Sequence, residues 1–241
     1  MKHLPQDFGA VTMTIRGVPL RLQASFFLVP FSLIACGFLG DAGWGRGILS
    51  MIFFLASLSV VAFLHEIGHI LLARRFGAPI RGIRLSGLGV FVTVERIPGL
   101  KPREEALIAL GGPAVSTLVS LALGAAGWLL LNLDSAARFH RLNLPAMVLL
   151  LAATNTLLTV FNLIPAFPMD GGQAVAALLR SRWSPARAER FVMTFGQTMA
   201  VAALPVVIFT TSDCLIQLAG IVTSGFILAA NYRKRQTLVV A

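Results

Sequence analysis

The sequence predicts an all-α polytopic membrane protein with about six transmembrane helices and a small β-hairpin between the second and third. Of the 241 residues, 56% are hydrophobic and only 12% are charged, whereas about 25% of the residues in a soluble domain are charged. Six apolar stretches have roughly the 17 to 25 residues that a membrane-spanning helix needs. They are approximately 22–40, 48–73, 105–131, 144–164, 190–211 and 214–230.

The positions of the basic residues along the chain show how the formal net charge of +10 should be interpreted. Seventeen of the twenty Lys and Arg lie in the N-terminal segment, the second-to-third connection, the fourth-to-fifth connection and the C-terminal segment. With six spans these four segments share one side, and short loops rich in Lys and Arg stay cytoplasmic. We therefore expect both termini in the cytoplasm and a basic surface beside anionic lipid, with no role in nucleic-acid binding.

The same reading gives the domain organisation. Residues 1–21 form a cytoplasmic lead-in, residues 22–231 a single transmembrane domain with its core at 48–180, and residues 232–241 a basic cytoplasmic tail. No stretch outside the spans is apolar enough for a second hydrophobic core. The fifth and sixth spans are the weakest, because Pro205 interrupts the fifth and the sixth is short.

The second span carries the sequence His-Glu-Ile-Gly-His at residues 65–69. On a helix, His65 and His69 project from one face and can bind one metal ion, while Glu66 can act on a water molecule held by that ion. Ionisable residues inside a membrane span mark a functional site by default. The alternative is a buried polar cluster that packs the helices without a metal.

Between the second and third spans, Ile80 to Ile97 alternates partly between apolar and polar residues and is bounded by Pro79 and Pro98. This pattern predicts a β-hairpin. It is either a surface hairpin on the cytoplasmic face or one that approaches the site and pairs with an extended peptide. The two interpretations are evenly matched.

The third span contains Gly-Gly-Pro at 111–113 and places Gly112, Ser116, Ser120 and Gly124 on one helix face. Small residues at this spacing let helix backbones approach closely in lipid. Packing without chemistry is the favoured interpretation for residues 116–124. The Gly-Gly-Pro segment has a further possible role, because a proline frees nearby backbone groups.

After the fourth span, two prolines and two glycines surround Asp170. Such residues cannot continue a regular helix. Taken alone, Asp170 is best explained as the N-cap of a helix that begins near Gln173.

Topology changes that interpretation of Asp170. The second span runs from outside to inside, and His65 lies roughly 26 Å along it, towards the cytoplasmic face. The fourth span has the same direction and delivers Asp170 to that face. His3 is in the lead-in and His140 is in an outer loop, so Asp170 is the preferred third ligand. Two imidazoles and a carboxylate leave the fourth position of a tetrahedral zinc for water, as in catalytic sites. Zinc lowers the pKa of that water, and Glu66 is placed to take its proton.

Three motifs together resemble the site-2 protease family of intramembrane zinc metalloproteases. They lie at 65–69, 111–113 and 162–172, in the family's order, and the likeness covers roughly residues 48–180. The resemblance implies Zn²⁺ held by His65, His69 and Asp170, with Glu66 as catalytic base. It also implies a single-pass transmembrane protein as substrate, cleaved within or near its membrane segment in regulated intramembrane proteolysis.

The resemblance also implies a substrate-binding or oxyanion-stabilising asparagine. Asn162 matches the family's position, and Asn155, seven residues earlier, is a weaker candidate; interhelical hydrogen bonding is the alternative for both. Met169 stands where leucine is common in the family, a mild apolar change. No PDZ or cystathionine-β-synthase domain is recognisable, and the sequence indicates no regulatory partner.

Two other functions fit part of the pattern. A membrane zinc peptidase acting on lipidated C-terminal tails would use the residues of the 65–69 motif but would not require Asp170. A metal-binding transporter or assembly factor would need no general base at Glu66. The preferred hypothesis is an intramembrane zinc metalloprotease in the cytoplasmic membrane, with its site reached from the cytoplasm.

Overall fold

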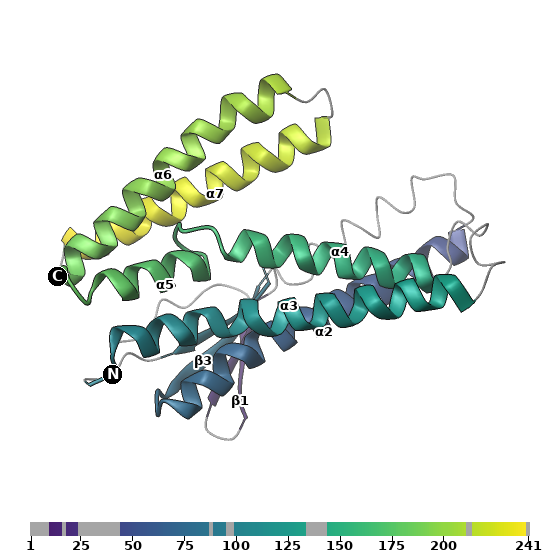
Figure 1. Cartoon of the computed structure of the whole chain (residues 1–241), viewed down its shortest axis with the longest axis horizontal. Coiled ribbons are helices and arrows are strands. Elements are labelled where there is room, and N and C mark those ends of the chain that lie inside the picture. The colour runs from purple at the N-terminus through teal and green to yellow at the C-terminus, as the bar shows by residue number, and fades with distance from the viewer. Residues whose placement is uncertain are drawn as a thin grey trace. The chain divides into compact units, whose positions relative to one another are not determined.

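The computed structural model describes residues 10–15, 18–23, 44–86, 89–94, 99–133, 144–210 and 214–239 (Figure 1). The chain divides into two compact units. The first comprises Met1–Pro98 and Gly111–Thr159, and the second comprises Gly99–Leu110 and Val160–Ala241. The prediction of a single membrane domain over residues 22–231 stays a prediction.

A four-stranded sheet in the first unit has the order β1-β2-β3-β4. The hairpin predicted at 80–97 is confirmed by β3 (Ile80–Ser86) and β4 (Gly89–Val94), which pair antiparallel with Ile83 opposite Val92. The strands β1 (Ala10–Ile15) and β2 (Val18–Gln23) lie where the sequence analysis expected only a lead-in. β2 pairs antiparallel with β1 and parallel with β3, and β4 contacts α2.

Three long helices accompany the sheet. They are α2 (Trp44–Arg75), the part of α3 (Pro102–Leu133) from Gly111 onwards, and α4 (Leu144–Asn162) up to Thr159. Glycines bring their backbones together: a Cβ on Gly68 would lie 2.1 Å from the carbonyl oxygen of Gly111, and one on Gly127 would lie 2.7 Å from Leu149. The helices therefore pack through small residues, as membrane helices commonly do.

The second unit contains α5 (Asp170–Leu179), α6 (Pro185–Thr210) and α7 (Cys214–Val239). Figure 1 shows α6 and α7 side by side in opposite directions. Ala106 and Ala109 of α3 pack on Ala174 and Ala177 of α5. Because all four side chains are small, these two helices lie close together.

The helices agree with five of the predicted spans. Within the described residues, α3, α4 and α6 are long and apolar enough to cross a membrane. α2 contains the predicted span 48–73, and α7 contains 214–230. The all-α membrane fold is confirmed, while the number of six spans stays a prediction. Most of the first predicted span, 22–40, lies outside the described residues, and its first two residues end β2.

Two details differ from the sequence interpretation. Pro205 lies inside α6, which continues to Thr210, so it does not break this helix. α7 continues through residues 232–239, so most of the expected tail extends the last helix.

Candidate metal centre

His65 and His69 occupy successive turns of α2, where a spacing of four residues places both imidazoles on one face. Their Nε2 atoms lie 3.2 Å apart, and the rings meet edge to face at 74°. Two nitrogens bound to a tetrahedral zinc at its usual bond length are about 3.3 Å apart. Both side chains are buried, with exposed fractions of 5% and 8%. The pair therefore has the separation that a shared metal ion requires.

Glu66 completes this buried group. One ligand atom from each of His65, Glu66 and His69 lies within 4.8 Å of the other two, so the three side chains could hold a metal ion. Glu66 is 7% exposed. A carboxylate beside two imidazoles in a helix of a membrane protein is costly to bury without a function. The structure thus brings together the three residues of the 65–69 motif.

Ser116 of α3 contacts the first imidazole from behind. Its Oγ lies 2.9 Å from Nδ1 of His65, and the hydroxyl is almost wholly buried. When Nδ1 carries the proton and donates it to Ser116, Nε2 of His65 keeps its lone pair for a metal. The sequence analysis favoured packing without chemistry for Ser116. That interpretation did not include the contact between its hydroxyl and an expected metal ligand.

Asn155 of α4 holds the same turn of α3. Its Nδ2 donates to the carbonyl oxygen of Ser116 and to Oγ of Ser120, both at 2.8 Å, and its side chain is fully buried. These are the interhelical hydrogen bonds expected in the alternative interpretation. Asn155 thus connects α4 to the helix that contacts His65. Its role towards a substrate stays a prediction.

Gly112 is the position on α3 closest to the imidazoles. A Cβ there would lie 2.3 Å from Nε2 of His69 and 2.5 Å from Nε2 of His65. Both distances are shorter than real Cβ contacts, so glycine leaves room for the two nitrogens where they lie and a larger residue would force a shift. Gly124, on the same face three turns later, has nothing within 4 Å of such a Cβ. The small-residue face therefore differs between its two ends: Gly112 lies against the imidazoles, whereas a Cβ at Gly124 would contact nothing within 4 Å.

Asp170 belongs to the second unit and is the first residue of α5. The N-cap is Met169, whose backbone is extended and whose side chain makes no capping hydrogen bond. The N-cap role considered for Asp170 is therefore wrong by one position. A carboxylate in the first turn still interacts favourably with the helix dipole. Asp170 is buried, with an exposed fraction of 9%.

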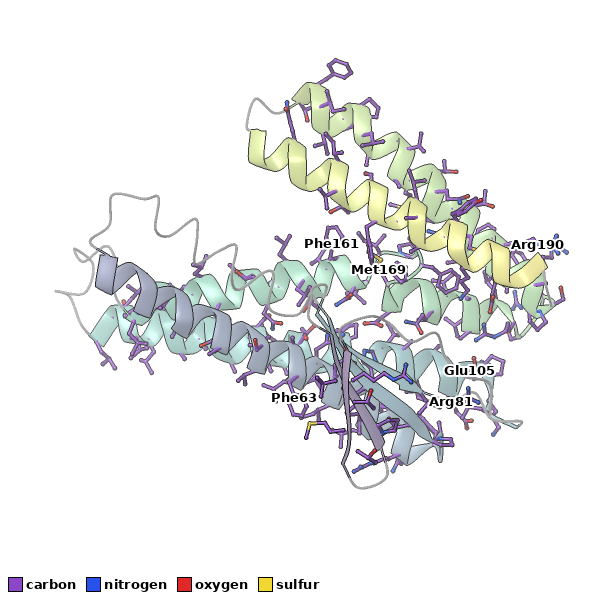
Figure 2. The ribbon with its side chains drawn as sticks, turned by 180° about the vertical axis from the view of Figure 1, so that it is seen from behind. Phe63, Arg81, Glu105, Phe161, Met169 and Arg190 are labelled. Carbon is purple, nitrogen blue, oxygen red and sulfur yellow. The ribbon has the colours of Figure 1, made fainter. Side chains whose placement is uncertain are left out.

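The glycines after Asp170 let α5 begin against the preceding segment. A Cβ on Gly171 would lie 2.2 Å from the carbonyl oxygen of Leu163, and one on Gly172 would lie 2.5 Å from that of Ala166. The segment 163–169 also folds on itself, since the amide of Met169 donates to Ala166 at 2.9 Å. Figure 2 shows Met169 near Phe161, which packs on the same hydrophobic cluster.

The structure also locates the remaining predicted residue. Asn162 is the last residue of α4, is half-buried and belongs to the second unit. The sequence analysis missed Ser116 and Gly112 as neighbours of the imidazoles. Their four-residue spacing on one face of α3 was the available signal, but it did not show which helix that face meets.

The family model for peptidase family M50 matches residues 53–136 and 129–203, which together cover more than half of the chain and include both the histidine motif and Asp170. The chain belongs to peptidase family M50. A solved structure, the site-2 protease from Methanocaldococcus jannaschii, aligns with a TM-score of 0.65 at 24% identity, covering 93% of this chain and 94% of that one. The M50 chain therefore has the fold of that protein.

The sequence of a curated relative also supports membership of this family. The zinc metalloprotease MJ0392 of Methanocaldococcus jannaschii is 30% identical over 192 residues, which are 79% of this M50 chain and 51% of the relative. The chain spans about half the length, or less, of the curated relatives that it matches.

Proposed function

We propose that this protein is an intramembrane zinc metalloprotease that hydrolyses peptide bonds within or near the transmembrane segments of other membrane proteins. The observation that carries the proposal is the pair of Nε2 atoms of His65 and His69, 3.2 Å apart in a buried group with Glu66. Membership of family M50 and the printed name of the curated relative support zinc and peptide hydrolysis.

Within this proposal, His65 and His69 hold the zinc ion and Asp170 supplies the third ligand. The imidazole–imidazole separation fits zinc, and the burial of Asp170 at the start of α5 suits a ligand carboxylate. When bound, zinc activates water and polarises the scissile carbonyl. Ser116 accepts a hydrogen bond from Nδ1 of His65 in the tautomer whose Nε2 is free to bind.

Glu66 is the proposed general base. It takes a proton from the attacking water and delivers a proton to the departing amine nitrogen as the C–N bond breaks. Asn162 is proposed to contact the substrate backbone, and Asn155 is the weaker candidate for that role. Because the peptide bonds of a regular helix are shielded from a nucleophile, the substrate helix must unwind locally before cleavage.

The proposed substrate is a single-pass transmembrane protein in the lipid bilayer of the cytoplasmic membrane. The basic connections favour a site reached from the cytoplasm, with both termini on that side. Lys101 and Arg103 at the start of α3 and Arg74 and Arg75 at the end of α2 are part of this basic set. Whether the β3–β4 hairpin lines the site stays a prediction.

The decisive experiment measures zinc content and cleavage for the detergent-purified wild type beside Glu66→Gln and Asp170→Ala. The cleavage assay uses a panel of single-pass membrane proteins reconstituted with the enzyme. We expect Glu66→Gln to retain zinc and lose about 10²- to 10⁴-fold in cleavage rate, since it removes only proton transfer. Asp170→Ala is expected to bind zinc much more weakly, so that its zinc content is sharply reduced.

Other results identify the rival functions. Zinc retained by Asp170→Ala would move the third ligand elsewhere and favour a peptidase acting on lipidated tails. Function unaffected by Glu66→Gln would favour a metal transporter or assembly factor, which needs no general base. Wild-type protein that binds no zinc would remove the basis of the mechanism.

A further inference from the structure

The segment that precedes Asp170 is held by the last helix of the chain. Nδ2 of Asn231 in α7 donates to the carbonyl oxygen of Phe167 at 3.0 Å and to that of Ile227 in its own helix at 2.7 Å. The Asn231 side chain is fully buried, and Phe167 is 3% exposed. A buried amide that donates to an irregular segment fixes that segment, because the carbonyl it satisfies has no helical partner.

A second contact holds the ring of the same residue. The ammonium nitrogen of Lys234, three residues further along α7, lies 3.4 Å from the ring centroid of Phe167. This is a cation–π contact on the residue whose backbone Asn231 already holds. Phe167 is therefore bound through both its carbonyl and its ring, three residues before Asp170.

An ion-pair network fixes Lys234 itself. Its Nζ lies 3.9 Å from Glu189 of α6, and Glu189 lies 3.8 Å from Arg180 at the end of α5. Arg180 also pairs with Glu105 at the start of α3. The side chains of Arg180 and Glu189 are only 10% and 9% exposed, so solvent screens their attraction less than that of surface pairs. The network thus connects α7 to α6 and to the C-terminal end of the helix that Asp170 begins.

α6 closes the other side of the segment. A Cβ on Gly196 would lie 2.6 Å from the Cβ of Ala166 and 3.6 Å from Nδ2 of Asn231. Ala166 is fully buried. Ala166 and Phe167 are therefore held between α6 and α7, and the position of this part of the segment depends on both helices.

We propose that Asn231 and Lys234 are positioning residues for the metal site, acting through Phe167 on the Asp170 carboxylate. This inference rests on the proposed role of Asp170 as a zinc ligand. It gives α7 a function at the metal site, because this helix would set where the third ligand stands. Groups that orient a ligand typically change metal affinity by about 10- to 100-fold when removed.

The test is a double-mutant cycle on zinc affinity, measured by competition with a chromophoric chelator on the full-length protein in detergent. The variants are Asn231→Leu and Lys234→Met, each made alone and with Asp170→Ala. Lys234→Arg keeps the cation and serves as the conservative rescue. Ser224→Ala, which removes another buried polar group from α7 two turns earlier, is the matched control.

We expect Asn231→Leu and Lys234→Met each to weaken zinc binding about 10-fold, with Lys234→Arg and Ser224→Ala close to wild type. Combined with Asp170→Ala, neither change should weaken binding further, because no third ligand remains to be positioned. Should Asn231→Leu not fold, Lys234→Met alone decides the question, since that side chain is partly exposed.

The contrary outcomes separate the two proposals. Unchanged affinity in Asp170→Ala would overturn the role of Asp170 as ligand. If Asp170→Ala loses zinc while Asn231→Leu and Lys234→Met bind it like wild type, only the positioning inference fails. Equal losses with and without Asp170 would show a general structural effect and would also overturn it.

Discussion

The hydroxyl of Ser116 lies within hydrogen-bond distance of Nδ1 of His65, and when Nδ1 donates to it, Nε2 of His65 is left for a metal. Because Asn155 bonds to the backbone carbonyl of Ser116 and not to its side chain, Ser116→Ala removes the contact with His65 while leaving the α3–α4 hydrogen bond to that carbonyl in place. We predict a loss of zinc affinity of about 10- to 100-fold for Ser116→Ala. Ser116→Thr, which keeps a hydroxyl, should retain most of the affinity.

Chelator competition on the purified variants measures this effect. Thr117→Ala is the neighbouring control, since its hydroxyl bonds within α3 to the carbonyl of Pro113 and should not affect zinc. Equal affinities for wild type and Ser116→Ala would contradict the orienting role.

The sequence predicted His65, Glu66 and His69 as one group because helical spacing alone places them together. Ser116 could not be assigned in the same way. A small polar residue on a glycine-rich face serves packing and ligand orientation equally well, and only the crossing of α2 and α3 shows that this face meets an imidazole. The role of Asp170 depends likewise on tertiary structure, so it stays a prediction from motif and topology.

At the scale of elements, the close crossing of α2 and α3 depends on glycine at position 112 of α3 and not at position 124 on the same face. Gly112→Ala would place a methyl group against both imidazoles. We predict that it lowers the unfolding temperature in detergent, with an overpacking cost of about 1–3 kcal/mol, and that it lowers zinc content. The reason is steric, since either the two imidazoles or the backbone of α3 must shift to make room for the methyl group.

Gly124→Ala is the matched control on the same helix. Its new methyl group meets nothing within 4 Å, and alanine is favoured over glycine in a helix interior by about 1 kcal/mol. This variant should bind zinc normally and unfold at the same temperature or slightly higher. Similar behaviour of the two variants would show that the face acts as a uniform packing surface.

Local patterns predicted some elements and missed others for physical reasons. The β3–β4 hairpin was recognisable because prolines bound an alternating segment. A new helix after α4 was recognisable because prolines and glycines end α4 abruptly. β1 and β2 were missed because Gly17 and Pro19 made this region read as an irregular lead-in. Pro19 pairs with Thr14 of β1 and directly precedes Leu20, where the parallel pairing with β3 begins. Val11 and Met13 of β1 are exposed, with fractions of 65% and 53%.

For the whole molecule, the remaining question is its direction in the membrane. α3 has 32 residues and is therefore roughly 47 Å long, enough to cross the hydrocarbon core of about 30 Å with both ends in water. Lys101 precedes its first residue and Leu133 is its last, and both are exposed. Because basic residues concentrate near Lys101, the start of α3 is expected in the cytoplasm.

Cysteine labelling of intact cells tests this orientation. After Cys36 and Cys214 are replaced by serine, we predict that a membrane-impermeant maleimide labels Leu133→Cys but labels Lys101→Cys only after the cells are permeabilised. The cysteine-free protein is the control for background labelling. The opposite pattern would place the basic connections outside and, with them, the end of α2 that carries His65 and His69. A cytoplasmic entry for water and substrate would then be wrong, even if zinc binding and cleavage were as proposed.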